Sequence, residues 1–344
     1  MRTDHGLPVV RLGLIGAGRI GTMHAGNLAR HVPGAELAAV ADTRPEAAVR
    51  LAARYGAATP DVDELLKDPG IDGVLITSLA IAHSELIVRA AEAGKAVWCE
   101  KPASLTLAEM DRAIDATERA GVPFQVGFNR RFARDFAAAQ QVIQDGGIGT
   151  PRLVRSITRD PGGPWGLRYA DRIPQWTIFR ETLIHDFDTL LWLNPGARPV
   201  EVYTTADALV APDYKERGLL DTAVVVITFD NGAIATAEAN FSSYYGYDVR
   251  GEVFGSEGMV EAGQLASSAL VHYTANGLHQ QTLRSDEEMF HDAYVQELTD
   301  FVDVVRTNGV PPVTGQDARK ALQVALAAMA SYEEHRPVRV EDVR

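Results

Sequence analysis

The chain has 344 residues, of which 46% are hydrophobic and 23% are charged. This is the composition of an ordinary globular protein, and the length favours two domains. The net charge of −13, with no run of lysine or arginine, argues against nucleic acid or an anionic membrane as a partner. The N-terminal residues lack an apolar secretory core, and no uncharged apolar stretch is long enough to span a bilayer. We therefore expect a cytoplasmic protein.

A glycine-rich loop follows the first apolar run of the chain. Gly16, Gly18 and Gly21 form the pattern G-x-G-x-x-G, and helical spacing begins at Arg19 and Ile20. In this order the first glycine permits a tight turn, the second lets backbone amides approach a pyrophosphate, and the third lets the helix pack close to the strand. The pyrophosphate would lie at the helix N-terminus. For the glycines alone, an ordinary turn is the alternative.

An acidic residue ends the next predicted strand. Asp42 lies 21 residues beyond Gly21, where a carboxylate suits the two ribose hydroxyls of an adenosine and repels a 2′-phosphate. The pattern therefore favours NAD over NADP, with Asp42 and its neighbour Thr43 beside the ribose. Arg44 is the argument against this preference, because a nearby arginine can accommodate the phosphate.

Strands and helices alternate through the first third of the chain, which is typical of a doubly wound parallel sheet. We predict a Rossmann domain over residues 1–128. In such a fold the carboxyl ends of the strands line the ligand crevice. The residues expected to line it are Ser78, Leu79, His83, Glu100 and Lys101.

The remainder of the chain, residues 129–344, is predicted to be an α+β domain. Its long alternating runs are joined by turn signals at residues 230–232 and 276–277, which indicates a large, mostly antiparallel, open-faced sheet. One face of such a sheet must be covered. The helices expected to cover it are residues 178–193 and 294–306.

A proline- and glycine-rich loop over residues 160–174 carries Trp165 and Tyr169. Loops of this length are more often functional than idle. The single cysteine, Cys99, cannot form an internal disulfide and is expected to be a small buried thiol. No histidine, cysteine or carboxylate pattern has the spacing of metal ligands, so we predict no metal.

One stretch of the second domain has the residues needed for proton transfer. A nicotinamide-dependent enzyme needs a group that exchanges a proton with the substrate hydroxyl, because the cofactor carries only the hydride. Glu181 and His185 are four residues apart, and Asp188 follows three residues later, so all three would share a helix face. A carboxylate one turn away can orient a histidine and raise its basicity. A solvated helix face or a capping histidine is the alternative.

Lys101 is the second candidate for chemistry. It follows a predicted parallel strand, where its charge could stabilise a developing alkoxide. A surface lysine in a turn fixed by Pro102 is the alternative.

The candidate residues lie in an arrangement that closely resembles the Gfo/Idh/MocA oxidoreductase family. The matching stretches are Gly16-Ala17-Gly18-Arg19-Ile20-Gly21 with His24, Glu100-Lys101-Pro102, residues 127–132 and Ile184-His185-Asp186-Phe187-Asp188. Within the family the chain is most similar to the inositol 2-dehydrogenases. The stretches that point to this subgroup are Arg159-Asp160-Pro161, Tyr245-Gly246-Tyr247-Asp248, residues 252–255 and Ala293-Tyr294 with Glu297.

The resemblance implies NAD-dependent oxidation of a ring hydroxyl in a cyclic polyol or sugar, by a homo-oligomer, usually a tetramer assembled through its sheets. It implies Lys101 and His185 as catalytic residues, with His185 as general base. Glu181 would orient His185, although the family usually has aspartate there. Candidates for holding substrate hydroxyls are Asn129, Trp176, Tyr245 and Tyr294.

Three alternatives stay open. The first is a dehydrogenase or reductase that acts on a pyranose sugar at another carbon. The second is a non-catalytic NAD-binding regulatory protein, against which the presence of Lys101 and His185 argues. The third is an enzyme that uses NAD catalytically to break a glycosidic bond.

Overall fold

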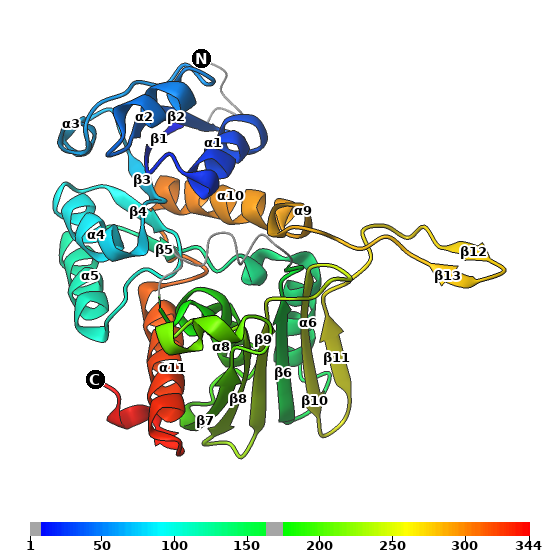
Figure 1. Ribbon diagram of the computed structural model, residues 1–344. Helices are drawn as coiled ribbons and strands as arrows, with labels where there is room; N and C mark the ends of the chain where they lie inside the picture. The colour runs from blue at the N-terminus through cyan, green and yellow to red at the C-terminus, as the bar shows by residue number, and fades with distance from the viewer. Residues whose placement is uncertain (1–7, 163–174) are drawn as a thin grey trace. The chain divides into compact units, whose positions relative to one another are not determined.

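The computed structural model describes residues 8–162 and 175–344, so Trp165 and Tyr169 lie outside the described residues. The chain divides into two compact units (Figure 1). Unit 1 comprises Met1–Phe132 and Asp292–Arg319, and unit 2 comprises Ala133–His291 and Lys320–Arg344.

Unit 1 is built on a five-stranded parallel sheet in the order β2-β1-β3-β4-β5. The predicted parallel sheet is therefore confirmed. Most positions in these strands are buried and apolar, as expected for a sheet covered on both faces. All carboxyl ends meet at one edge, and the strand order reverses beside β1, where doubly wound folds bind ligands. The strands are β1 (Val10–Ile15), β2 (Ala35–Ala41), β3 (Gly73–Ile76), β4 (Ala96–Cys99) and β5 (Phe124–Val126).

The helices of unit 1 begin and end at local sequence signals. Pro45 occupies the first turn of α2, Asp61 and Glu64 form a capping box on α3, and Gly121 ends α5 in the left-handed region at a φ of 65°. The elements are α1 (Arg19–His31), α2 (Pro45–Ala52), α3 (Val62–Lys67), η1 (Ala80–Ala82), α4 (His83–Glu92), α5 (Leu107–Ala120) and η2 (Asn129–Phe132).

Helix α10 (His291–Thr307) belongs to unit 1, although it follows most of unit 2 in the sequence. Leu298, Phe301 and Val302 are buried in the same core as strand β1. The Gln125 side chain in β5 donates a hydrogen bond of 2.9 Å to the carbonyl of Glu297. The prediction that this helix covers the second sheet is wrong, because the spacing of its apolar residues shows that one face is buried but not which sheet buries it.

Unit 2 contains a seven-stranded sheet in the order β11-β10-β6-β9-β8-β7-β14, antiparallel except for the pair β6 and β9. The turn at residues 230–232 joins β8 to β9, so that predicted hairpin is confirmed. The strands are β6 (Pro151–Arg159), β7 (Pro199–Asp207), β8 (Thr222–Phe229), β9 (Ile234–Asn240), β10 (Asp248–Gly255), β11 (Met259–Ala262) and β14 (Val338–Arg339).

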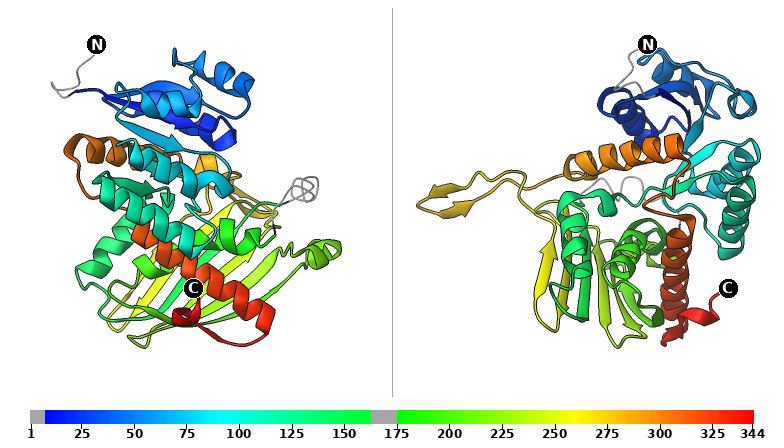
Figure 2. Two further views of the ribbon diagram at one scale, coloured as in Figure 1. Left: turned by 90° about the vertical axis from the view of Figure 1, so that its left-hand side faces the viewer. Right: turned by 180° about the vertical axis from the view of Figure 1, so that it is seen from behind.

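Helices cover one face of this sheet (Figure 2). Helix α8 packs against β6 and β9, and Ser331 in α11 accepts a hydrogen bond of 3.0 Å from the amide of Thr204 in β7. The boundary between the two units falls within α11, at Arg319. The elements are α6 (Arg134–Gln144), η4 (Ile178–Thr182), α8 (Leu183–Trp192), η5 (Pro212–Arg217), α9 (Asp286–Met289), α11 (Gly315–Glu334) and η6 (Val340–Asp342).

The other face of the sheet, here called the open face, carries exposed apolar side chains. Met259, Phe254, Leu153 and Ile234 are direct partners across four neighbouring strands and form a continuous exposed row. Tyr203 and Val224 are exposed on the strands beyond it. Across the two described ranges, the structure holds no helix long and apolar enough to cross a membrane.

A separate hairpin projects from unit 2 beyond β11. It consists of β12 (His272–Thr274) and β13 (Gly277–His279), which the predicted turn at residues 276–277 connects. The views agree that these strands stand away from the seven-stranded sheet (Figures 1 and 2).

Candidate cofactor and catalytic sites

The glycine loop of unit 1 has the geometry that a pyrophosphate site requires. Gly16 has a φ of 112°, and a Cβ there would lie 2.6 Å from the backbone nitrogen of Ser78. A Cβ on Gly21 would lie 1.9 Å from the carbonyl oxygen of Gly16, so only glycine permits this close packing. A Cβ on Gly18 would meet nothing within 4 Å, which leaves that side of the loop open.

Helix α1 begins directly behind this loop. Its N-cap is Gly18, which provides no side-chain cap, and its first turn contains no acidic residue. The amides of the first turn and the positive end of the helix dipole therefore suit an anion. Arg19 is exposed and Ile20 half-buried at this helix start. The residues present fit the pyrophosphate of a dinucleotide.

Asp42 connects the end of β2 to the glycine loop. Its carboxylate accepts hydrogen bonds of 2.6 Å from the Ala17 amide and 2.8 Å from the Arg44 amide. Burial alone would raise the pKa of Asp42, but these bonds and the Arg44 charge outweigh burial and hold the pKa below its ordinary value. Asp42 is therefore a firmly placed anion beside the loop. The Arg44 side chain and Thr43 are exposed next to it.

The segment after β3 contributes exposed apolar side chains and a hydroxyl group that holds the glycine loop. Leu79 and Ile81 are both 78% exposed, so two apolar side chains are available there for contact with a flat ring. Thr77 holds the glycine loop, because its hydroxyl donates to the Gly16 carbonyl at 2.7 Å. Local sequence patterns did not indicate Ile81.

His83 has a bridging position in the structure. Its ring is buried, with Nδ1 2.8 Å from the carbonyl oxygen of Pro102 and Nε2 3.1 Å from that of Ser78. It thus ties the segment after β3 to the segment after β4. Direct cofactor contact by His83 stays a prediction.

Glu100 is the centre of a buried polar cluster after β4. One carboxylate oxygen lies 3.0 Å from Nε2 of His24 in α1, and the other accepts a hydrogen bond of 3.0 Å from the backbone amide of Lys101. Burial would raise the pKa of Glu100, but the His24 hydrogen bond and the charges of His24, Lys101 and His83 outweigh burial and lower it. The cluster therefore fixes the backbone at half-buried Lys101.

Two residues of α10 lie against this cluster. Tyr294 packs edge-on against the His24 ring at 5.6 Å between centroids. The Glu297 side chain is fully buried, and neither of its oxygens has a hydrogen-bond partner in the described ranges. Burial and the nearby charge of Glu100 raise the pKa of Glu297 well above its ordinary value. Burial and this neighbouring charge therefore both favour the protonated form of Glu297.

Cys99 and Asn129 are the remaining candidates in unit 1. Cys99 is a free, buried thiol, and burial together with the Glu100 charge raises its pKa well above the ordinary value. The predicted small buried thiol is therefore confirmed, and its raised pKa disfavours the reactive thiolate. Asn129 is buried in η2, and its amide oxygen has no partner in the described part of the chain. Its role in holding substrate stays a prediction.

In unit 2, Glu181 and His185 lie on two different kinds of helix. Glu181 is in η4, a π-helical turn, and His185 is in α8. The prediction of one uninterrupted helix is therefore wrong in its first turn, where the hydrogen bonds run to the fifth residue rather than the fourth. Both side chains are half-buried. π-Turns occur frequently at functional sites.

A buried carboxylate anchors α8 to the sheet. Asp186 accepts hydrogen bonds from the hydroxyls of Ser156 and Thr158 in β6, at 2.6 and 2.7 Å. Asp188 is also buried. These hydroxyls lie on the helix-covered face, so they hold the start of α8, and with it His185, at a fixed position on β6.

Trp176 lies in an aromatic cluster just before η4. Its ring packs against Phe179 and against Tyr332 of α11, at 6.4 and 5.8 Å between centroids. Its φ of 63° is uncommon for a bulky residue. Such strain persists only where the surroundings enforce it, and it is often found at functional sites.

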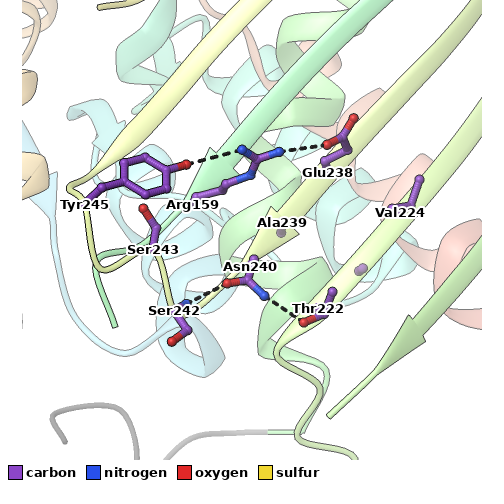
Figure 3. Close-up of a pocket in the computed structure, with 10 residues that line it drawn as sticks. Arg159, Thr222, Val224, Glu238, Ala239, Asn240, Ser242, Ser243 and Tyr245 are labelled. Carbon is purple, nitrogen blue, oxygen red and sulfur yellow. Dashed lines mark hydrogen bonds and ion pairs between the residues drawn. The ribbon is translucent and has the colours of Figure 1, made fainter. Parts of the chain in front are cut away.

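Tyr245 lies at a hollow of about 320 Å³ on the open face (Figure 3). Its hydroxyl donates to Asp248 at 2.7 Å and accepts from Arg159 at 3.2 Å. Arg159 alternates along β6 with Ser156 and Thr158, so its side chain is on the face opposite to α8. The structure therefore does not bring the Tyr245 hydroxyl to the same face as His185.

Both polar residues and the apolar residues Ala223, Val224 and Ala239 line the rest of this hollow. Arg159 also pairs with Glu238 at 3.2 Å, and the Asn240 amide donates to Thr222 at 2.8 Å (Figure 3). In residues 8–162 and 175–344, the hollow included, no group of three histidine, cysteine or acidic side chains could hold a metal ion.

Comparison with known proteins extends these observations to the whole chain. The model of an oxidoreductase family with an NAD-binding Rossmann fold matches residues 10–128, and the model of the GFO/IDH/MocA C-terminal domain matches residues 136–261. The chain is 39% identical to myo-inositol 2-dehydrogenase from Thermotoga maritima, covering 97% of this chain and 99% of that protein. It is 37% identical to scyllo-inositol 2-dehydrogenase (NAD(+)) from Bacillus subtilis, covering 96% of each.

A solved structure agrees in fold. Scyllo-inositol dehydrogenase from Lactobacillus casei, with bound NAD(H) and scyllo-inositol, superposes with a TM-score of 0.92 at 26% identity, covering 97% of this chain and 99% of that one. The glycine loop, Asp42 and the family match together confirm the predicted NAD cofactor. The chain belongs to the GFO/IDH/MocA family of oxidoreductases, with an NAD-binding Rossmann fold.

Proposed function

We propose that the chain is an NAD-dependent dehydrogenase that oxidises a ring secondary hydroxyl of an inositol or a closely related cyclic polyol. The observation that carries this proposal is the similarity, over nearly the full length, to relatives named inositol 2-dehydrogenases. The firmly placed Asp42 and the anchored helix α8 support it.

In this proposal the protein supplies the proton chemistry. His185 takes the proton of the ring hydroxyl as general base, and Glu181 orients it. Lys101, whose backbone Glu100 fixes, stabilises the negative charge that develops on the same oxygen. Bound NAD supplies the acceptor for the hydride from the ring carbon. Asn129, Trp176 and Tyr294 are the candidates for holding other hydroxyls of the ring.

The cofactor preference follows from Asp42. Its carboxylate is ionised and already hydrogen-bonded to the loop, so a 2′-phosphate beside it meets a fixed negative charge. We expect kcat/KM to be at least about tenfold higher with NAD than with NADP, roughly 1.4 kcal/mol. Steady-state kinetics with both cofactors measure this ratio. Equal efficiencies would mean that exposed Arg44 accommodates the phosphate.

The substrate is tested by NADH absorbance across a panel of inositols and pyranoses, with wild type and Glu181→Asp. If Glu181 orients His185, the shorter side chain holds the histidine poorly and lowers kcat/KM by a similar factor for every substrate. If Glu181 contacts a substrate hydroxyl, the rank order of substrates changes, since an unpaired hydroxyl costs about 1–3 kcal/mol. We expect inositols to lead in wild type and a uniform drop in the variant.

The panel also tests the proposed activity itself. Turnover confined to pyranoses would replace the inositol assignment with a sugar dehydrogenase. If NAD binds but no member of the panel reacts in either direction, the non-catalytic alternative gains support.

We also propose that the protein is a homo-oligomer, a tetramer by its family resemblance, with the open face as a contact surface. The exposed row Met259, Phe254, Leu153 and Ile234 supports this, because a monomer rarely leaves such a continuous apolar row in water. A cytoplasmic location stays a prediction.

A further inference from the structure

The hairpin beyond β11 has unusual composition for an exposed segment. We call residues 263–283 the arm. None of them is Asp, Glu, Lys or Arg, although at the chain average of 23% about five charged residues would be expected. The chain as a whole carries a net charge of −13, so the neutrality of the arm is a local feature.

The arm is also uncovered. Every residue from His272 to Gln281 is exposed. Leu270, Tyr273 and Leu278 are 69%, 76% and 60% exposed, and Tyr273 and Leu278 are direct partners across the hairpin. Each strand of the hairpin has three residues, and an isolated two-stranded hairpin of this kind is at best marginally stable in water. The exposed pair of Tyr273 and Leu278 offers apolar contact area, and tyrosine is enriched at protein interfaces.

The composition of the arm restricts its partner. Nucleic acids and anionic membranes are bound through lysine and arginine, which the arm lacks. A strongly charged protein surface would lose hydration against the arm without gaining an ion pair. The partner must therefore offer apolar and neutral polar groups.

The same chain offers such a surface. The open face carries the row Met259, Phe254, Leu153 and Ile234, with Tyr203 and Val224 on the strands beyond it. A neutral arm also suits contact between two copies that each carry a charge of −13, because it adds no like-charge repulsion.

We propose that the arm docks onto a second copy of this chain, so that Tyr273 and Leu278 become buried between protomers. This inference rests on the proposed homo-oligomer and names a segment that holds it together. The arm is ordered at its base by the chain itself, where the Ser267 amide donates to the Gln281 carbonyl at 2.9 Å. The residues beyond this base are the ones that the partner must cover.

Two variants test the arm without touching a buried residue of unit 2. One replaces residues 268–280 with an Asn-Gly turn between the paired Ser267 and Gln281. The other combines Tyr273→Ser with Leu278→Ser. The matched control is Leu209→Ser, which removes a side chain that is 67% exposed on another loop of unit 2.

Molar mass is measured by sedimentation velocity over a range of protein concentrations. We expect wild type and the Leu209 variant to share one oligomeric mass, and both arm variants to dissociate to a smaller species, with a dissociation constant raised at least about tenfold. If the wild type is oligomeric and the arm variants keep its mass and dissociation constant, the proposed role of the arm is overturned, while the proposed homo-oligomer is not. A wild type that is monomeric at every concentration would overturn both the arm and the proposed homo-oligomer.

Discussion

Replacing His185 with alanine is expected to lower kcat by a factor of about 10² to 10⁴. The imidazole is the proposed acceptor of the hydroxyl proton, and alanine leaves that proton to water. Helix α8 should keep its position, because the hydrogen bonds of Asp186 to Ser156 and Thr158 hold it to β6 and do not involve the replaced ring. NAD affinity should stay near that of wild type, since the glycine loop and Asp42 lie in unit 1.

Single-turnover kinetics and NAD titration by fluorescence separate these two effects. The control is His31→Ala, which makes the same substitution at an exposed histidine in the last turn of α1. It should leave kcat and NAD binding unchanged. Near-normal turnover in the His185 variant would identify that histidine as an ordinary helix-face residue and would remove the general base from the proposed mechanism.

Replacing Glu297 with glutamine is expected to change how stability depends on pH. The pKa of this buried carboxyl is raised well above 4.5 by burial and by the charge of Glu100. Above pH 4.5 the unfolded chain releases the proton while the folded chain retains it. Wild-type stability therefore falls as pH rises, until the folded carboxyl also ionises. Glutamine matches the shape of the neutral acid and has no proton to release.

The difference in unfolding free energy between the glutamine variant and wild type should widen by about 1.4 kcal/mol for each pH unit in that window. Urea unfolding at a series of pH values, with hydrogen exchange in β5 and α10 to report on unit 1, measures this difference. The matched control is Glu118→Gln, on an exposed position of α5 in the same unit. If the Glu297 variant and wild type have parallel pH profiles, the carboxyl is ionised in the folded protein.

Local patterns predicted the parts of the structure that neighbouring residues determine. The glycine loop, the helix that follows it and Asp42 belong to one strand-turn-helix-strand unit. Their spacing along the chain was therefore sufficient to predict that they lie together. The two turn signals predicted hairpins because a turn constrains the strands on both sides of it.

Patterns of the same kind could not find contacts made by distant segments. His24 and Glu100 are 76 residues apart and meet only because β1 and β4 flank β3 in one parallel sheet. Glu297 comes to this cluster from α10, and nothing in its own helix indicates which sheet that helix covers. The π-turn at Glu181 was missed for a different reason. A prediction from residue spacing assumes the hydrogen-bond pattern of an α-helix, and this turn has a different pattern.

The return of α10 to unit 1 has a consequence for how the protein is made. Leu298, Phe301 and Val302 complete the core beneath β1 and β2, yet they leave the ribosome after nearly all of unit 2. The nucleotide-binding unit therefore cannot finish folding when its own sheet has been synthesised, and the apolar surface that α10 later covers stays exposed through the synthesis of residues 133–291. The path of the chain thus orders the folding of the two units: unit 1 begins first but is completed only after residues 133–291 of unit 2 have emerged.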